Sequence, residues 1–187
     1  MSKKILIVVG SLRQGSYNLK IAKHIVKSNP IQAEFKIAKI DDLALYSELY
    51  DDASETPEAY TRIREDVEQA DGVIFITPEY NRGTSAALKN AIDVVSRPWG
   101  QSKWNNKPCS IISSTIGTSG AISANYQVRQ TLNCLNAPVM PAPEVCLFGI
   151  SSSFNENDEL INEIVEKILE NFTQSFDQWI EKFKRDF

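Results

Sequence analysis

The stretch GVIFITPEYNRGTSAALKNAID, residues 72–93, decides the fold class. Its small and apolar run Val73–Thr77 is typical of a strand buried in a sheet. The polar and aromatic loop Pro78-Glu79-Tyr80-Asn81 follows, and a helical pattern begins near Thr84. The order strand, loop, helix places this loop at the carboxyl end of a parallel strand. Open α/β sheets bind their ligands at that edge.

The rest of the chain alternates strands and helices in the same way. Strands are predicted at 4–9, 34–40, 72–77, 108–114 and within 139–147, and helices at 18–28, 57–70, 84–96, 119–136 and 155–187. Asn18 is available as the N-cap of the first helix. Right-handed crossovers between such strands give an α/β fold, a doubly wound parallel sheet with helices on both faces.

The bulk composition limits the classes of function. A chain of 187 residues can bury one full core, so a single domain over residues 1–187 is expected. The net charge of −4 argues against nucleic acid or an anionic membrane as the main partner. No apolar run of the sequence approaches the ~18–20 residues of a membrane span. We therefore expect no nucleic-acid partner and no membrane partner.

The sequence offers few residues for metal binding or acid–base catalysis. Cys109, Cys134 and Cys146 are far apart and form no C-x-x-C motif. No metal site is expected, and a reducing cytoplasm is the simplest compartment. The one histidine, His24, lies among lysines on a predicted helix, and we expect it to be an exposed surface residue. No catalytic side chain is assigned.

The loop after the first strand, GSLRQGSYN at residues 10–18, has the chemistry of an anion site. A loop that enters a helix offers free backbone N–H groups and the positive end of the helix dipole. Ser11, Ser16 and Asn18 add short donors, and Arg13 adds a charged fork. This set suits a phosphate monoester, where many donors converge on one terminal group.

Two nucleotide-binding motifs do not fit this loop. Gly10 and Gly15 have the spacing of a P-loop, but Ser16 stands where its lysine is required, and Tyr17 follows. The dinucleotide fingerprint G-x-G-x-x-G is also absent. An ATPase and a standard NAD site both lose support, and a terminal phosphate without metal chemistry remains.

Two further loops stand at corresponding places. In the loop after the third strand, Pro78 stiffens the backbone, and Tyr80 and Asn81 suit a flat heteroaromatic ring by stacking and hydrogen bonding. The loop SSTIGTSG at 113–120 joins a strand to a helix, and its glycines permit close approach of the backbone to a ligand. Taken alone, each loop also suits an ordinary β–α turn, and that alternative stays open.

These motifs resemble the NADPH-dependent FMN reductase family. The resemblance is carried by GSLRQGSYN at 10–18, TPEYNRGTSAALKNAID at 77–93, and SSTIGTSG at 113–120 followed by YQVRQTL, and it extends from about Lys3 to Glu144. It implies a flavodoxin-like fold with five strands in the order 2-1-3-4-5. Members of the family reduce quinones, chromate and azo compounds.

The resemblance also implies a cofactor and its ligands. FMN would be bound, with its phosphate at Ser11, Arg13, Ser16, Tyr17 and Asn18, its ring at Pro78, Glu79, Tyr80 and Asn81, and a third contact at Thr115 and Gly117. Backbone N–H groups near Thr115–Gly117 are expected to stabilise negative charge on the reduced flavin. NADPH or NADH would supply the hydride, and a quinone, flavin, azo compound or oxyanion would accept the electrons.

The chain departs from the family pattern in its third loop. It has Gly120-Ala121 where many members have paired glycines, and Ser123 stands where an arginine is expected in the quinone-reducing members. The choice between NADPH and NADH and the identity of the acceptor therefore stay open.

The C-terminal segment and the resemblance both point to self-association. A helix over Asn155–Phe187 would be roughly 50 Å long, which is longer than a small domain requires. Its apolar stripe is predicted at Ile161, Ile164 or Val165, Ile168, Phe172, Phe176, Trp179 and Phe183. A homodimer or homotetramer is expected.

Three other functions share the predicted topology. A non-enzymatic flavodoxin-type electron carrier is the main alternative, although such carriers are expected to be more acidic and to lack the arginine of the first loop. A phospho-acceptor receiver domain needs an acidic cluster after the first strand, where this chain has Gly10-Ser11. An iron–sulfur flavoprotein is disfavoured by the cysteine spacing.

Overall fold

The computed structural model describes residues 2–183. One parallel sheet of five strands forms its centre, in the order β2-β1-β3-β4-β5 that the resemblance implied. The strands are β1 (Lys4–Val9), β2 (Glu34–Ile37), β3 (Gly72–Thr77), β4 (Cys109–Ser114) and β5 (Val145–Leu147). The helices are α1 (Tyr17–Ser28), α2 (Glu58–Gln69), α3 (Ala86–Val95), α4 (Ile122–Cys134) and α5 (Glu163–Glu181), with short 3-10 turns at Glu48–Asp51 and Ile150–Ser153.

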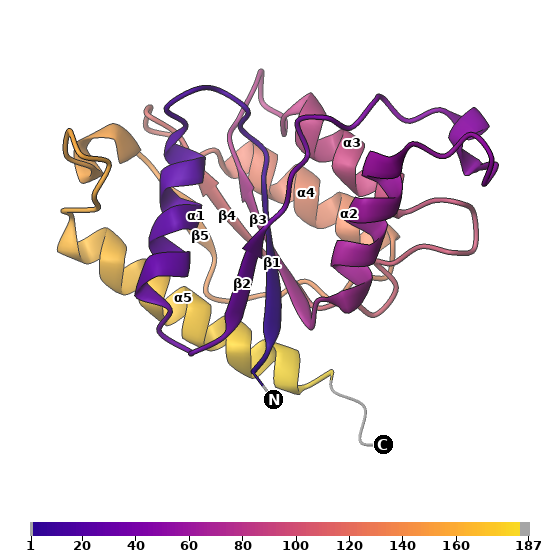
Figure 1. The fold of residues 1–187 in the computed structure, drawn as a ribbon. Coiled ribbons are helices and arrows are strands. Elements are labelled where there is room, and N and C mark those ends of the chain that lie inside the picture. Colours follow the sequence, from indigo (N-terminus) through magenta and orange to yellow (C-terminus); the bar gives the residue numbers. More distant parts are fainter. Residues whose placement is uncertain (1, 184–187) are drawn as a thin grey trace.

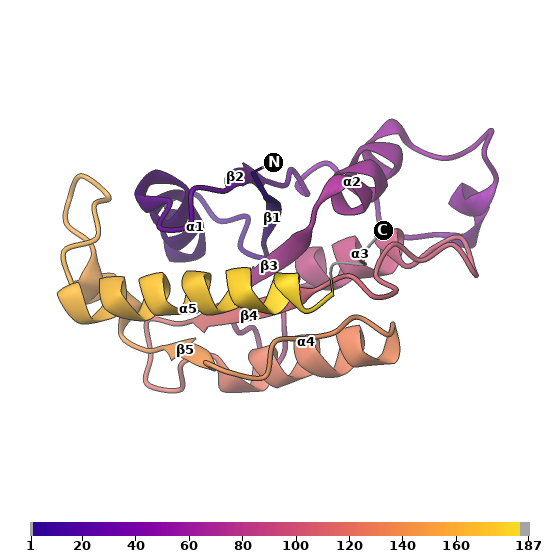
Figure 2. The ribbon, with the colours of Figure 1, turned by 90° about the horizontal axis from the view of Figure 1, so that it is seen from below.

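Helices cover both faces of the sheet. In β1, Ile5, Ile7 and Val9 face the core beneath α1 and α5, whereas Leu6 and Val8 face the core beneath α2, α3 and α4. This division follows from the two-residue period of a strand, and burial on both faces explains the continuous apolar run. Figure 1 shows α1 to the left of the strands, α5 running from the lower left across their lower ends, and α2 and α3 to the right, and Figure 2 shows the layers from below.

The strand predictions are accurate in the centre of the sheet and less so at its edge. The observed β3 has the predicted bounds, Gly72–Thr77, and all six of its residues are buried. The edge strand β2 ends at Ile37 rather than at residue 40. An edge strand pairs on one side only, so fewer ladder hydrogen bonds mark its end.

The capping residue of α1 differs from the prediction. Ser16, not Asn18, is the N-cap, and its Oγ accepts a hydrogen bond from the Leu19 N–H at 3.3 Å. The helix therefore begins at Tyr17, which moves Asn18 into the first turn, where it is buried. Both residues are good caps, so composition alone did not separate them.

The C-terminal helix is shorter than predicted. It begins at Glu163, because Asn162 accepts hydrogen bonds from the N–H groups of Ile164 and Val165, and it ends at Glu181. Its 19 residues span about 28 Å, and residues 184–187 lie outside the described part. The predicted stripe is correct at Val165, Phe172 and Phe176, which are buried, and wrong at Ile161, which is 60% exposed. The length of this helix therefore no longer indicates self-association.

No helix within residues 2–183 is both long enough and apolar enough to cross a membrane.

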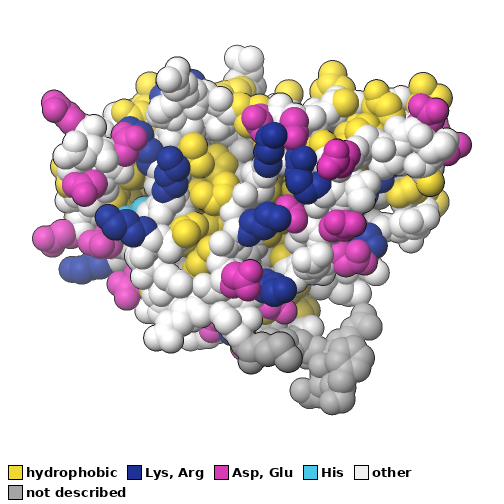
Figure 3. All heavy atoms as spheres, viewed as in Figure 1, with side chains coloured by type: hydrophobic (Ala, Val, Ile, Leu, Met, Phe, Trp, Pro, Cys, Tyr) yellow, Lys and Arg dark blue, Asp and Glu magenta, His cyan; other side chains and the backbone are white. Residues whose placement is uncertain are grey.

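His24 lies in a partly hollow surface region rather than on a freely exposed face. It is half-buried on α1, and it lines a groove with Lys20, Lys23 and Lys27. Burial lowers the pKa of His24, helped by the charge of Lys27 and opposed by that of Glu166. Figure 3 shows the lysines over α1 facing carboxylates at the left edge of the molecule. His24 is thus at the surface but less exposed than predicted.

Close packing of α5 on β3 gives a stability prediction. A Cβ added at Gly72 would lie 2.7 Å from Ile180 Cδ1 and 2.8 Å from Phe176 Cζ. We expect Gly72→Ala to lower the free energy of unfolding by about 1–3 kcal/mol through this overpacking. The measurement is urea unfolding followed by far-UV circular dichroism.

Gly117→Ala is the matched control. The nearest atom to its added Cβ is Thr115 Oγ1, at 3.8 Å. Equal unfolding midpoints for the two variants would show that α5 does not pack on Gly72 as described.

Candidate functional site

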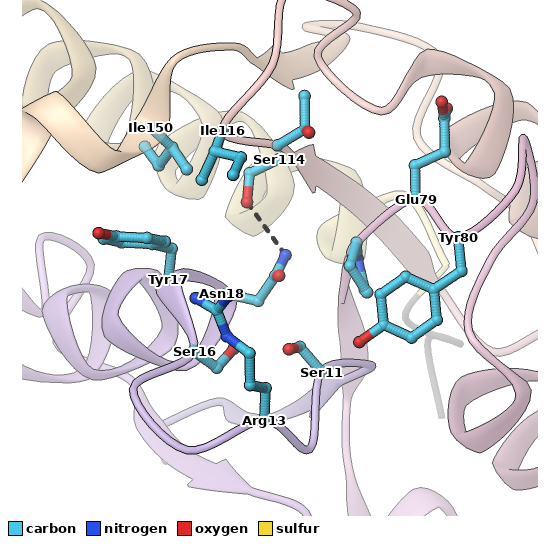
Figure 4. Close-up of a pocket in the computed structure, with 12 residues that line it drawn as sticks. Ser11, Arg13, Ser16, Tyr17, Asn18, Glu79, Tyr80, Ser114, Ile116 and Ile150 are labelled. Carbon is cyan, nitrogen blue, oxygen red and sulfur yellow. Dashed lines mark hydrogen bonds between the residues drawn. The ribbon is translucent and has the colours of Figure 1, made fainter.

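Three loops meet at one edge of the sheet and enclose a cleft. They leave the carboxyl ends of β1, β3 and β4, which all lie at the top of Figure 1. The cleft has a volume of about 180 Å³. Its lining residues are Ser11, Arg13, Ser16, Tyr17, Asn18, Pro78, Glu79, Tyr80, Ser114, Thr115, Ile116 and Ile150 (Figure 4). Nine of the eleven predicted site residues are in this set, and Asn81 and Gly117 are not.

The β1–α1 loop presents unpaired N–H groups to the cleft. The Ser16 N–H donates to the Arg13 carbonyl at 3.1 Å and closes a turn. Within the described residues, the backbone N–H groups of Ser11 to Gly15, and those of Tyr17 and Asn18 in the first turn of α1, have no acceptor. The Ser16 side chain is 2% exposed, whereas Arg13 is exposed to solvent. Such a set of free N–H groups at a helix N-terminus can bind an anion.

Asn18 forms part of the inner wall of the cleft. Its side chain is 5% exposed, and its Nδ2 donates to Ser114 Oγ at 3.1 Å. The dashed line in Figure 4 marks this bond. It connects α1 to the end of β4, so Asn18 holds two of the three loops at a fixed separation. Ser114 escaped the sequence-based assignment because it looks like an ordinary strand residue.

The first and second loops approach each other closely at Gly10. Ser85 Oγ donates to the Gly10 carbonyl at 2.5 Å, and the Gly10 N–H donates to the Ile76 carbonyl at 2.8 Å. A Cβ at Gly10 would lie 3.1 Å from Leu88 Cβ and from Pro78 Cδ. Glycine therefore favours close packing here, and Ser85 also caps α3 through the Leu88 N–H.

Glu79 turns its carboxylate toward α4. Its Oε2 accepts hydrogen bonds from the Ser123 N–H at 3.0 Å and the Ala124 N–H at 3.4 Å. Figure 4 shows this side chain directed away from Ser11 and Arg13. A carboxylate at a helix N-terminus is favourable. Glu79 thus joins the second loop to the third, and its backbone rather than its carboxylate faces the cleft.

Asn81 lies at the tip of a tight turn. Tyr80 and Gly83 exchange two backbone hydrogen bonds, at 2.8 and 3.0 Å. Asn81 and Arg82 between them have φ values of 52° and 64°, as a type I′ turn requires. Asparagine tolerates this conformation well. The turn explains why Asn81 does not line the cleft.

Within Thr115–Gly117 the third loop has one free N–H group instead of several. The Thr115 N–H donates to the Leu147 carbonyl at 3.0 Å, and the Gly117 N–H donates to Thr115 Oγ1 at 3.2 Å. The Ile116 N–H has no acceptor among residues 2–183. Of the N–H groups that the sequence singled out here, Ile116 is the available donor. Its side chain and that of Ile150 form an apolar lip that sequence motifs did not reveal.

The chain resembles several redox proteins over most of its length. A family model for NADPH-dependent FMN reductases matches residues 3–149. A quinone reductase from Pseudomonas putida is 44% identical over 156 residues, which cover 83% of each chain. A 2-hydroxy-1,4-benzoquinone reductase from a Burkholderia species is 37% identical over 163 residues, with 87% of this chain and 88% of the relative covered.

A solved structure gives the same result. The flavoenzyme NAD(P)H:(acceptor) oxidoreductase FerB from Paracoccus denitrificans has a TM-score of 0.88 and 35% identity. The alignment covers 97% of this chain and 98% of that one. This chain therefore resembles that flavoenzyme in both fold and sequence over nearly its whole length.

The departure at Ala121 has a structural cost. Gly120 and Ala121 have φ values of 61° and 58°, in the left-handed region that favours glycine. A Cβ at Gly120 would lie 2.8 Å from the Cys146 carbonyl oxygen, so glycine is required there. The Cβ of Ala121 fits in its surroundings. Its left-handed backbone conformation still costs about 1–2 kcal/mol for an L-residue.

Two alanine-to-glycine substitutions isolate this strain. Ala121 and Ala124 are both 0% exposed, so each loses a buried methyl group and gains chain entropy in the unfolded state. Only Ala121 is left-handed. We expect Ala121→Gly to be more stable than Ala124→Gly by about 1–2 kcal/mol in urea unfolding. Identical stabilities would contradict the assigned strain.

Proposed function

The chain belongs to the NADPH-dependent FMN reductase family, and we propose that it passes electrons from NAD(P)H through FMN to quinones. The observation that carries this proposal is the convergence of an anion site and an apolar slot in one cleft. The anion site is the β1–α1 loop, and the slot lies between the β3–α3 and β4–α4 loops. The family and its named reductase relatives make the protein an oxidoreductase rather than an electron carrier.

The first loop fits the phosphate of FMN. Its free N–H groups, the buried hydroxyl of Ser16 and the guanidinium of Arg13 are donors that a phosphate dianion can accept together. Because Ser16 Oγ already accepts from Leu19, its hydrogen is free to donate to such a ligand. The positive end of α1 adds a favourable field.

The other two loops fit a flat ring. Pro78 is buried and rigid at one side, and Ile116 and Ile150 lie at the other. Tyr80 is 51% exposed at the rim, where its ring can stack on a ligand or on a second substrate. The Glu79 and Ile116 N–H groups have no acceptor within residues 2–183 and suit the polar edge of an isoalloxazine. This pairing of an apolar slot with edge donors is typical of cofactor sites.

In this proposal the protein's own residues bind the cofactor, orient it and enclose it in the cleft. FMN, when bound, supplies the redox chemistry by accepting a hydride from reduced nicotinamide and delivering electrons to an acceptor. Asn18 and Ser114 set the width of the cleft, Ser85 holds the first two loops together, and Glu79 holds the third. No acid or base is assigned among these side chains, since they have structural partners.

Quinones are the acceptors best supported. The two relatives with the highest identity quoted above are named quinone reductases, and the apolar rim of the cleft suits a small planar ring. The description of the matching family favours NADPH over NADH as the hydride donor. The three cysteines are all free, which fits a reducing cytoplasm as the compartment.

A homodimer or homotetramer completes the proposal. Leu45, Leu49 and Trp99 are 76%, 75% and 85% exposed. Large exposed apolar side chains of this kind favour burial against a partner subunit. Sedimentation as a monomer at micromolar concentration would remove this part of the proposal.

Steady-state kinetics test the function directly. We expect the protein supplied with FMN to consume NADPH when 1,4-benzoquinone is present, at a rate proportional to protein concentration. NADH in a parallel series measures the nicotinamide preference. NADPH consumption no faster than with FMN and quinone alone would contradict the proposed activity.

Arg13→Ala tests the phosphate site. Loss of a charge-assisted contact should weaken FMN binding by about 2 kcal/mol, roughly thirtyfold in Kd. Quenching of flavin fluorescence measures the affinity. Arg62→Ala is the control, because Arg62 lies on α2, pairs with Asp42 and does not line the cleft. Unchanged FMN affinity in Arg13→Ala would place the phosphate elsewhere.

A further inference from the structure

Tyr17 connects the candidate phosphate loop to a second group of residues outside the cleft. Its ring lines the cleft, and the Arg13 guanidinium carbon lies 6.0 Å from the ring centroid. Figure 4 shows the Arg13 side chain extending from the loop toward Tyr17 and Asn18. Arg13 has no ion pair within residues 2–183. The Arg13 guanidinium therefore rests against the Tyr17 ring.

Lys20 is held on the same ring from the next turn of α1. Its ammonium lies 4.7 Å from the Tyr17 centroid and 5.8 Å from that of Phe154. The two rings are 6.0 Å apart. The Lys20 side chain is only 15% exposed, although lysine normally reaches into water. Residues three apart on a helix are neighbours, which places this charge against Tyr17.

A short strap supplies the counter-charge of Lys20. We use "strap" for residues 154–162, which an antiparallel bridge between Phe154 and Leu160 closes into a loop. Asn155 Oδ1 accepts from the N–H groups of Asn157 and Glu159, both at 2.9 Å. This turn presents Asp158, whose Oδ1 lies 2.5 Å from the Lys20 ammonium nitrogen.

The strap is attached to α1 at few points. A groove of about 780 Å³ separates the rest of the strap from α1, with Lys23, His24 and Lys27 along its floor. Among residues 2–183, Lys20–Asp158 is the one ion pair between α1 and the strap. Lys20 therefore lies between the strap and the helix, beside the contact of Phe154 with Tyr17.

We propose that Lys20 is a positioning residue for the phosphate of FMN and that it acts through Tyr17. Its ammonium, anchored by Asp158 and enclosed by the two rings, fixes the Tyr17 ring as the surface that holds Arg13 ready for the phosphate. A preordered arginine loses less side-chain freedom on binding, and this gain is specific to a ligand that carries the phosphate. The inference rests on the proposed function, and Lys20 itself does not line the cleft.

The affinities of FMN and riboflavin together test the inference, because riboflavin lacks only the phosphate. Lys20→Met keeps the apolar stem and removes the charge. We expect it to weaken FMN binding about tenfold, as for a desolvated cation–π contact, and to leave riboflavin affinity unchanged. Lys20→Arg, which can still lie on both rings and pair with Asp158, should restore FMN affinity.

Two further variants separate positioning from general structure. Tyr17→Leu should weaken FMN binding as Lys20→Met does, and the double variant should be no weaker than either, because both remove one arrangement. Lys23→Met is the matched control, since Lys23 is an exposed lysine on the same helix without an ion pair in residues 2–183. It should bind both flavins as the unmodified protein does.

The outcomes are distinct. Equal weakening of FMN and riboflavin in Lys20→Met would mean a merely structural role and would overturn the inference, as would FMN affinity that does not change. Failure of the unmodified protein to bind either flavin would overturn the proposed function, and this inference with it. FMN binding that drops selectively and recovers in Lys20→Arg is the result that supports it.

Discussion

The hydrogen bond from Ser85 to the Gly10 carbonyl, at 2.5 Å, is the contact on which the arrangement of the cleft depends. The absence of a side chain at position 10 favours it, since a Cβ there would lie 3.1 Å from Leu88 Cβ and Pro78 Cδ. The bond brings the end of β1 against the start of α3. The anion site of one loop and the rigid proline of the next then face a common space, which neither loop would create alone.

The other contacts around the cleft complete this arrangement. Asn18 bonds to Ser114 across the inner wall, and Glu79 reaches the first turn of α4. Each of these polar side chains is directed at protein rather than into the cleft, whose lining then offers backbone N–H groups, the Ser16 hydroxyl, the Arg13 guanidinium and apolar surface. A cleft of this kind suits the flat, phosphate-bearing cofactor that we propose, which would supply the redox chemistry.

The fold and most of the cleft could be predicted from the sequence, because both depend on local patterns. Strand β3 and the three loops follow directly from apolar runs that end in Gly, Pro, Ser and Asn. The predictions fail where particular contacts in the folded chain determine a helix start or the direction of a side chain. Asn155 and Asn162 both look like helix starts, and only the strap's own hydrogen bonds make the second one the cap of α5. Glu79 and Asn81 fit the motif of a ring-binding loop, yet the positions of α4 and of Gly83 determine where their side chains go. Ser114 and Ile116 lie in the third-loop motif without being distinguished by it, and Ile150 lies outside all three motifs; the sheet topology brings them to the cleft.

The central claim is that this cleft holds FMN and that NAD(P)H reduces it there. The most direct test is the visible spectrum of the protein after addition of FMN and removal of the free flavin, followed by anaerobic titration with NADPH. We expect flavin absorbance that is retained at about one equivalent and that bleaches promptly when NADPH is added. Retained flavin that NADPH fails to bleach would contradict the reductase activity. Loss of all flavin, together with no NADPH oxidation in the presence of free FMN, would contradict the assignment of the cleft itself.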